Sequence, residues 1–143
     1  MILLDSNVLV YASVPQDPRH PACRNAVAEA ARRPREFCVT WVNLFEYLRV
    51  VTHPKVLSAP LPFSDAFENL RGLASRVTLI HPGERHLEYV ARVAADLAPV
   101  RGDQVFDCRI AAILLENGGS RILSFDTRLR RVGSLQVESP ART

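Results

Sequence analysis

Short apolar runs alternate along the chain with longer stretches of helical periodicity. A short run flanked by turn residues predicts a buried strand, whereas apolar residues three and four positions apart predict a helix that packs one face on a core. Strands and helices that alternate in this way favour an α/β domain with a largely parallel sheet. We expect strands over residues 2–4, 37–40, 77–80 and 122–125, and helices over residues 22–33, 41–51, 65–73, 84–98 and 107–117.

Local signals indicate where several of these elements begin and end. The segment Asp5–Asn7 follows the first strand, and all three of its side chains favour turns and helix starts. Ser64 is expected to cap the helix that follows it, and Gly118, the first of two adjacent glycines, to end the helix before it. Because no repeat, low-complexity tract or long linker interrupts the pattern, we expect a single domain over residues 1–143.

Composition narrows the class of protein. The chain has 143 residues, of which 48% are hydrophobic and 23% charged, as in an ordinary globular domain. No stretch approaches the roughly 18 apolar residues that a membrane span needs, so we expect no membrane partner. The N-terminus has no basic lead and carries an acid in its first apolar run, which is untypical of a secretory signal. We therefore expect a cytoplasmic protein.

The cysteines agree with a reducing compartment. Cys23, Cys38 and Cys108 form an odd, widely spaced set without a CxxC motif, which is typical of reduced thiols. His20 and Cys23 have the spacing of a ligand pair, but no second pair completes a structural zinc site. We expect these cysteines to serve as small hydrophobic side chains in the core.

The basic residues are almost all arginine, with Lys55 the only lysine, and the net charge is +3. Arginine binds phosphate well because its planar fork donates hydrogen bonds in pairs. Genomic base composition also enriches arginine, so the excess permits a nucleic-acid partner without requiring one. The arginines gather in two clusters: Arg128, Arg130 and Arg131 near the C-terminus, and Arg32, Arg33 and Arg35 in the first half.

Four acids lie in or beside apolar segments: Asp5, Glu46, Asp107 and Asp126. An ionised side chain in a dry interior costs several kcal/mol unless it finds a partner, shifts its pKa or binds a cation. Each aspartate alone has an ordinary explanation as a cap of a helix or turn. Glu46 is harder to explain in this way, because its helical neighbours four residues away on either side are valines; Arg49 is its potential partner.

The predicted order of elements brings these acids toward one crevice. Two of them follow strands, one lies on the helix after a strand and one begins a late helix, and open α/β sheets bind ligands beyond the carboxyl ends of their strands. Four neighbouring carboxylates would repel one another without a cation. Oxygen ligands select Mg²⁺ or Mn²⁺, and such a site can hydrolyse a phosphodiester.

The motifs around these acids resemble those of the PIN-domain ribonucleases. Leu3 to Leu9 is similar to the family's opening strand motif, with Ser6 where many members carry threonine, and Asn43 to Glu46 to its second-acid helix. The segments 105–112 and 123–126 are similar to its third-acid motif and its last strand with the fourth acid. Residues 51–56, Val-Thr-His-Pro-Lys-Val, also resemble a segment common in the VapC toxins of type II toxin–antitoxin pairs.

The resemblance implies a three-layer α/β fold and a Mg²⁺-dependent endoribonuclease in which Mn²⁺ can substitute. Asp5 and Asp107 would be the core metal ligands, Glu46 and Asp126 would complete the pocket directly or through water, and Asn7 and Ser124 would hold the carboxylates. A metal-activated water would leave a 5′-phosphate and a 3′-hydroxyl. The implied partners are RNA, a VapB-like antitoxin and a second copy of the chain in a homodimer.

Two departures from the family pattern bear on the site. Many relatives carry another acid where this chain has Arg128, which would weaken a second metal position, and a small residue is usual at Cys108. Asp103 is a nearby acid that we expect to lie in a loop. The arginines 128, 130 and 131 are the expected contacts to the RNA backbone.

Two other functions remain open from the sequence. The first is a housekeeping PIN nuclease that processes RNA without an antitoxin. The second is a PIN-like binding module without catalysis, in which the acids act only as caps. A phosphoacceptor receiver domain also clusters acids at strand ends, but the single lysine, Lys55, does not follow a strand as that chemistry requires.

Overall fold

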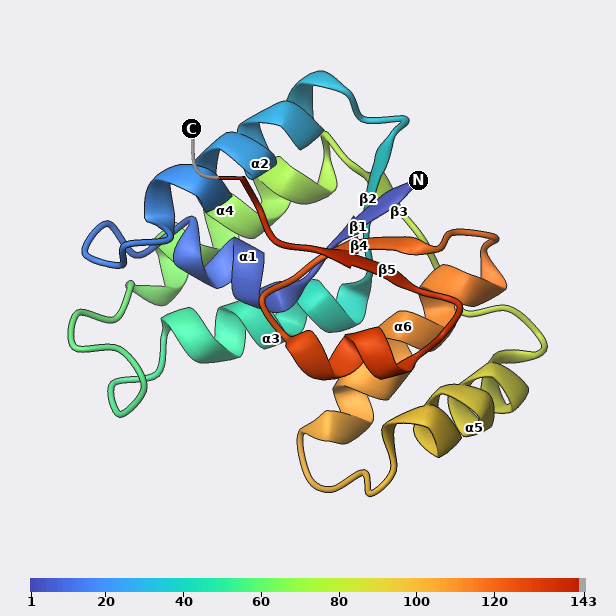
Figure 1. The fold of residues 1–143 in the computed structure, drawn as a ribbon. Helices are drawn as coiled ribbons and strands as arrows, with labels where there is room; N and C mark the ends of the chain where they lie inside the picture. Colours follow the sequence, from blue (N-terminus) through green and yellow to red (C-terminus); the bar gives the residue numbers. More distant parts are fainter. Residues whose placement is uncertain (142–143) are drawn as a thin grey trace.

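Five parallel strands form one sheet at the centre of the molecule (Figure 1). The structure is a computed structural model that describes residues 1–141, so the expected domain over residues 1–143 includes two residues outside the described part. The strand order is β3-β2-β1-β4-β5. The strands are β1 (Ile2–Leu4), β2 (Phe37–Val39), β3 (Thr78–Leu79), β4 (Arg121–Leu123) and β5 (Gln136–Glu138).

Helices cover both faces of the sheet, which gives three layers (Figure 1). Successive strand residues point to opposite faces. Leu4 and Val39 accordingly pack in one core with the first four helices, whereas Leu3, Cys38 and Ile122 pack in a second core with the last two. The expected three-layer α/β fold is confirmed. The helices are α1 (Ser6–Tyr11), α2 (His20–Arg32), α3 (Trp41–Val51), α4 (Phe63–Ala74), α5 (His86–Leu97) and α6 (Gln104–Glu116).

The strand β1 occupies the middle of the sheet, between β2 and β4. Leu3 pairs in register with Cys38 on one side and Ile122 on the other. Just beyond the strands, the Asp5 amide donates to the Leu123 carbonyl at 3.0 Å. The carboxyl ends of these strands therefore open onto one edge of the sheet, where polar residues from distant parts of the sequence meet.

Several sequence predictions are confirmed in detail. The helix predicted over residues 41–51 is α3 with the same bounds. Gly118 adopts φ +76°, a left-handed conformation in which glycine carries no Cβ penalty. The Gly119 amide donates to the Leu114 carbonyl at 3.0 Å, so α6 ends as the two glycines predict.

Other boundaries differ from the predictions. Ser64 does not cap α4, because the helix begins at Phe63 and the Pro62 carbonyl accepts from the Ala66 amide at 3.1 Å. Helix α6 begins at Gln104, three residues earlier than predicted, and the Gln104 side chain accepts from the Arg101 amide at 3.0 Å.

The C-terminal region holds two elements that the apolar pattern does not predict. The fourth strand ends at Leu123, before Ser124, and a 3₁₀ helix, η1, then covers Thr127–Arg131. Strand β5 adds a fifth strand at the edge, where Val137 packs on the second core between two exposed polar residues. Within residues 1–141, no helix is long and apolar enough to cross a membrane.

Candidate active site

Asp5 lies at the end of the central strand and is only 5% exposed. It caps α1, with its Oδ1 atom accepting from the Ser6 amide at 2.8 Å. Its Oδ2 atom accepts from Ser124 Oγ at 2.5 Å and from Asn7 Nδ2 at 2.8 Å. The cap interpretation of Asp5 is therefore correct as far as it goes, but the same carboxylate is also bound by side chains from two ends of the sequence.

The hydrogen bonds around Asp5 continue into neighbouring elements. Asn7 Nδ2 also donates to Ser124 Oγ at 3.1 Å, and Ser124 Oγ accepts from the Asp126 amide at 2.9 Å. The predicted supporting residues Asn7 and Ser124 thus contact the first acid directly. Because a hydroxyl both donates and accepts, Ser124 links the ends of β1 and β4 into one polar network.

Helix α3 positions the second acid. Thr40 and Asn43 form a capping box: the Asn43 amide donates to Thr40 Oγ1 at 3.1 Å and the Thr40 amide donates to Asn43 Oδ1 at 3.0 Å. Asn43 Nδ2 also donates to Ser6 Oγ at 3.4 Å, which ties α3 to the start of α1. One turn further along α3 lies Glu46, whose side chain is 19% exposed. Its expected partner Arg49 lies one turn later, with 3.9 Å between Arg49 Nη2 and Glu46 Oε1.

Helix α6 presents the third acid from its first turn, where the helix dipole favours a negative charge. The Asp107 side chain is 24% exposed, and its Oδ2 atom accepts from Arg128 Nη2 at 3.0 Å. Asp103 lies at the N-cap position of α6 with 78% of its side chain exposed, where its carboxylate is 3.9 Å from Arg49. Asp103 points to solvent, away from the polar network.

Asp126 is bound by the residue two positions later. Its Oδ1 atom accepts from the Arg128 amide at 2.9 Å and caps η1, and Arg128 Nε and Nη2 also donate to its carboxylate. Arg128 Nη2 therefore bridges Asp126 and Asp107. Arg128, an expected RNA contact, thus has one edge of its guanidinium bound inside the acidic site, while 47% of its side chain is exposed.

The surroundings of Asp5 and Asp107 disfavour the charged form. Burial, the largest cause, and the charges of Glu46 and Asp126 together raise the pKa of Asp5 to about 6, against the hydrogen bonds from Ser124 and Ser6 that lower it. Burial also raises the pKa of Asp107 to about 7, together with the charges of Asp5, Glu46 and Asp126 and against that of Arg128. The four acids therefore lie close enough to interact electrostatically.

Asp126 behaves in the opposite way. Burial disfavours its charged form, but the hydrogen bonds and the charge of Arg128 outweigh burial and lower its pKa. The pKa of Arg128 is raised in turn by the bonds that it donates to Asp126. The structure thus divides the three aspartates into Asp126, which an arginine neutralises, and Asp5 and Asp107, which nothing in the described chain neutralises fully.

The donor set fits a hard divalent cation in its chemistry. Asp5, Glu46 and Asp107 offer carboxylate oxygens at one edge of the sheet, and their mutual repulsion would be relieved by a positive ion. Within residues 1–141, however, no three side chains of His, Cys, Asp or Glu already converge as a metal site. Arg128 accounts for part of this arrangement, because its ion pairs hold Asp107 and Asp126.

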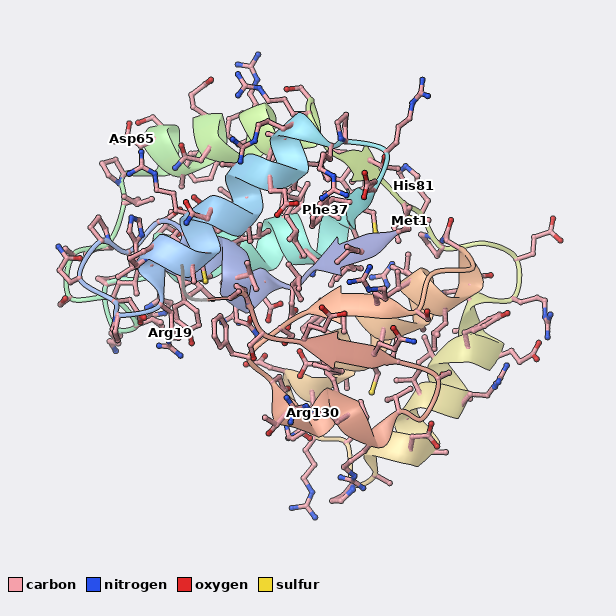
Figure 2. All side chains as sticks on the ribbon, turned by 45° about the horizontal axis from the view of Figure 1, so that its top comes forward. Met1, Arg19, Phe37, Asp65, His81 and Arg130 are labelled. Atoms are coloured by element: carbon pink, nitrogen blue, oxygen red, sulfur yellow. The ribbon has the colours of Figure 1, made fainter. Side chains whose placement is uncertain are left out.

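The predicted basic clusters are only partly available to a ligand. Arg131 donates to the Ala98 carbonyl at 2.7 Å and Arg33 pairs with Glu29 and Glu36. Arg130 is exposed on η1 at the edge of the molecule (Figure 2) and forms no ion pair with any of residues 1–141. Arg130 is therefore the member of its cluster with a fully available guanidinium.

The order of the four acids along the sequence is the one that the PIN-domain motifs have. The sequence model of the PIN domain family matches residues 2–135, which includes all four acids. The chain belongs to the PIN-domain family. Its PIN domain shares the fold of solved VapBC complexes: VapBC2 from Rickettsia felis, bound to a promoter DNA fragment, superposes with a TM-score of 0.69 at 18% identity over 97% of this chain and 98% of that one. VapBC-1 from nontypeable Haemophilus influenzae gives 0.65 at 16% identity, over the same shares of the two chains.

Curated relatives are more similar in sequence. Ribonuclease VapC48 of Mycobacterium tuberculosis (strain CDC 1551 / Oshkosh) is 32% identical over 137 residues, which are 95% of this chain and 94% of that protein. Ribonuclease VapC33 of the same strain is 31% identical over 144 residues, or 99% of each chain. The resemblance to VapC proteins that the sequence motifs indicate is confirmed.

Sequence reasoning missed part of the network. Thr40 and Asn43 are buried polar residues that position α3, and their spacing of three residues before an apolar run is a detectable capping signal. Trp41 and Phe45 are 45% and 60% exposed on the same helix, and Phe106 is 46% exposed on α6. Periodicity assigns such residues to a core, so only the fold reveals this exposed aromatic surface.

Proposed function

We propose that this PIN domain is a metal-dependent endoribonuclease, the VapC-type toxin of a toxin–antitoxin pair, which hydrolyses RNA phosphodiester bonds. The observation that carries the proposal is the meeting of Asp5, Glu46, Asp107 and Asp126 at the carboxyl edge of a parallel sheet. A buried carboxylate such as Asp5 destabilises a fold unless a cation or proton compensates it. The names of the curated relatives support the same activity.

In this proposal Asp5 and Asp107 hold Mg²⁺ or Mn²⁺, and Glu46 and Asp126 complete the pocket directly or through water. The bound ion supplies an activated water and neutralises charge that develops on the phosphate. Ser124 and Asn7 fix the orientation of the Asp5 carboxylate through their hydrogen bonds. The protein thus contributes orientation and burial to the reaction.

The RNA backbone approaches an edge that is acidic at its centre and basic around it. Arg130 on η1 is exposed and available for a phosphate, and Arg128 keeps 47% of its side chain exposed while one edge contacts the acids. Arginine donates in pairs to phosphate oxygens, and such contacts position a strand without reading its sequence.

The test compares two neighbouring acids on α6. Asp107→Asn should abolish cleavage of structured RNA in Mg²⁺ or Mn²⁺ and leave the circular dichroism spectrum unchanged. Asp103→Asn removes the same charge four residues earlier from a side chain that is 78% exposed, and it should retain cleavage. Cleavage by Asp107→Asn at the wild-type rate, or cleavage that persists in excess chelator, would contradict the proposal and favour a binding module without catalysis.

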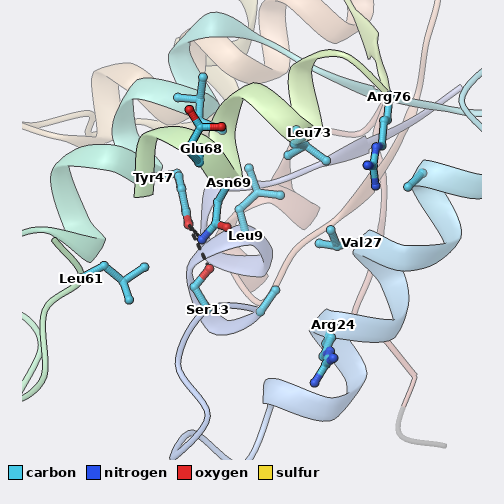
Figure 3. Close-up of a pocket in the computed structure, with 14 residues that line it drawn as sticks. Leu9, Ser13, Arg24, Val27, Tyr47, Leu61, Glu68, Asn69, Leu73 and Arg76 are labelled. Atoms are coloured by element: carbon cyan, nitrogen blue, oxygen red, sulfur yellow. Dashed lines mark hydrogen bonds between the residues drawn. The ribbon is translucent and has the colours of Figure 1, made fainter. Parts of the chain in front are cut away.

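A groove beside α1 offers a surface that suits the antitoxin partner. This groove of about 430 Å³ lies between α2 and α4, with Val27 and Leu73 on its walls and Arg24 and Arg76 at its rim (Figure 3). Glu68 also lines this groove but pairs with Arg71, so the two rim arginines suit the apolar face of a helix that also carries acidic residues. We therefore propose that a segment of a VapB-like antitoxin occupies it, as the VapBC names of the solved relatives suggest.

This partner is tested by binding to the product of the reading frame upstream of the gene. Val27→Arg should weaken binding by at least about tenfold, because it places a charge in the apolar wall. Leu87→Arg is the matched control on α5, where the native side chain is 82% exposed. If no such reading frame exists, or if both variants bind as the wild type does, the housekeeping nuclease is favoured over the toxin.

A homodimer is also part of the proposal. Trp41 and Phe45 of α3 and Phe106 of α6 border a second groove of about 360 Å³, and contiguous exposed aromatics of this kind indicate a protein contact. Light scattering should report a dimer for the wild type and a monomer for Phe45→Glu. A wild-type monomer at micromolar concentration would contradict this part.

A further inference from the structure

Arg128 binds two acids whose side chains are largely buried, whereas the two acids that Arg33 binds are about half exposed. Its Nη2 atom donates to Asp126 Oδ2 at 2.5 Å and to Asp107 Oδ2 at 3.0 Å, and its Nε atom donates to Asp126 Oδ1 at 3.0 Å. Asp107 on α6 and Asp126 at the N-cap of η1 are 19 residues apart in sequence, and their carboxylates share one cation. A guanidinium bound to two carboxylates compensates their negative charge through charge-assisted hydrogen bonds.

Little space remains beside this guanidinium. The cavity that Asp107, Asp126 and Arg128 border together measures about 10 Å³, which is roughly the space for one water molecule. The other half of the acidic site is different. Asp5 forms no ion pair with any of residues 1–141, and Glu46 has only the distant Arg49 at 3.9 Å. The only arginine among residues 1–141 that donates a hydrogen bond to these four acids therefore lies on the Asp107–Asp126 side.

We propose that the Arg128 guanidinium takes the place of a second divalent ion, so that this site binds a single ion through Asp5, Glu46 and Asp107. Asp126 then holds Arg128 and is not a direct ligand of the ion, which narrows its proposed role to a contact through water. This inference rests on the proposed metal-dependent function and concerns how many ions that function uses. Arg128 in this account limits the site to one bound ion.

The same geometry leaves one edge of the Arg128 guanidinium available for a ligand. Its Nη1 atom donates to no residue in the described part of the chain, and 47% of the side chain is exposed. The edge that faces away from the acids can therefore donate to a phosphate oxygen while the other edge stays bound. In two-metal sites the second ion stabilises charge on the phosphate, and in this proposal the guanidinium would supply that charge.

The experiment counts bound Mn²⁺ by electron paramagnetic resonance of the free ion, with protein in excess of the dissociation constant. The wild type should bind one ion per chain and Arg128→Ala two. Arg130→Ala is the matched control, because it removes the same charge from the same 3₁₀ helix without touching an acid, and it should bind one. Circular dichroism checks each fold, and Arg128→Gln, which keeps most of the side-chain length, replaces the alanine variant if that variant does not fold.

The outcomes separate this inference from the proposed function. Two ions in the wild type, one ion in the variants of Arg128, or two ions in Arg130→Ala would each overturn the inference while leaving a metal-dependent nuclease in place. A wild type that binds no Mn²⁺ would overturn the metal-dependent function itself. One ion in the wild type and in Arg130→Ala, with two in Arg128→Ala, is the result that only a resident guanidinium predicts.

Discussion

The substitution Asp5→Asn should stabilise the metal-free protein while it removes a metal ligand. Burial raises the pKa of Asp5 from 3.8 to about 6. Since one pKa unit corresponds to about 1.4 kcal/mol, the ionised carboxylate costs the native state about 3 kcal/mol near pH 7.5. The amide has one oxygen to accept the donors that the carboxylate now accepts, and the donor left without a partner costs about 1 kcal/mol. The expected net gain is about 2 kcal/mol.

The sign of this effect depends on pH. Between the unfolded pKa of 3.8 and the folded pKa of about 6, the native state binds more protons than the unfolded state, so wild-type stability falls as pH rises. Near pH 4.5 the ionisation cost is only about 1 kcal/mol, and it cancels the lost hydrogen bond. Asp5→Asn should therefore match the wild type near pH 4.5 and exceed it near pH 7.5.

Urea denaturation in excess chelator, at one protein concentration, measures both differences. Asp96→Asn serves as the control, because Asp96 is exposed on α5 and its substitution should change the free energy of unfolding by less than about 0.5 kcal/mol at either pH. Two results would refute the assignment of Asp5 as a buried, uncompensated acid. One is an Asp5→Asn variant that is less stable than the wild type near pH 7.5. The other is a difference in the free energy of unfolding between variant and wild type that is the same at both pH values.

Three further predictions follow from the same geometry. Mg²⁺ should raise the melting temperature of the wild type more near pH 7.5 than near pH 4.5, because protons compete for Asp5 and Asp107; an equal shift in differential scanning fluorimetry would contradict this. Ser124→Ala removes a hydrogen bond that lowers the pKa of Asp5 and should weaken Mg²⁺ binding about tenfold in calorimetry, whereas unchanged affinity would exclude a supporting role. Asn43→Ala breaks the capping box with Thr40 and should lower the free energy of unfolding by about 1–2 kcal/mol in urea; a loss below about 0.5 kcal/mol would count against it.

The central fold was predictable because a parallel strand that is buried on both faces consists of a continuous run of apolar residues. Residues 2–4 and 37–39 are such runs, and α3 shows helical spacing between clear boundaries. Strand β5 carries no such signal, since it lies at the sheet edge and exposes Gln136 and Glu138. Its alternation of polar, apolar and polar residues over three positions is too short to distinguish from a loop.

The four acids were predictable for a similar reason, since a charge beside an apolar run is conspicuous. The partners of these acids were less so. Asp126 and Arg128 are two residues apart, but the contact of Arg128 with Asp107 joins residues that are 21 positions apart. That contact arises only when η1 packs beside α6, and the short apolar contacts that position η1, Leu129 among them, give no periodic signal. An arginine assigned to RNA from the sequence therefore turns out to have one edge in the acidic site.

Two acids of this site solve the same electrostatic problem by different means. Asp126 receives a permanent cation from two residues away, so its charged form is favoured and its pKa is lowered. Asp5 receives only hydrogen bonds, which offset part of the desolvation cost, and its pKa stays raised. A site meant only for stability would pair Asp5 as well, because a buried carboxylate without a counter-ion makes the fold less stable near neutral pH. The part of the site without a counter-ion, where Asp5 lies near Asp107 and Glu46, is therefore where an external cation gains the most free energy by binding.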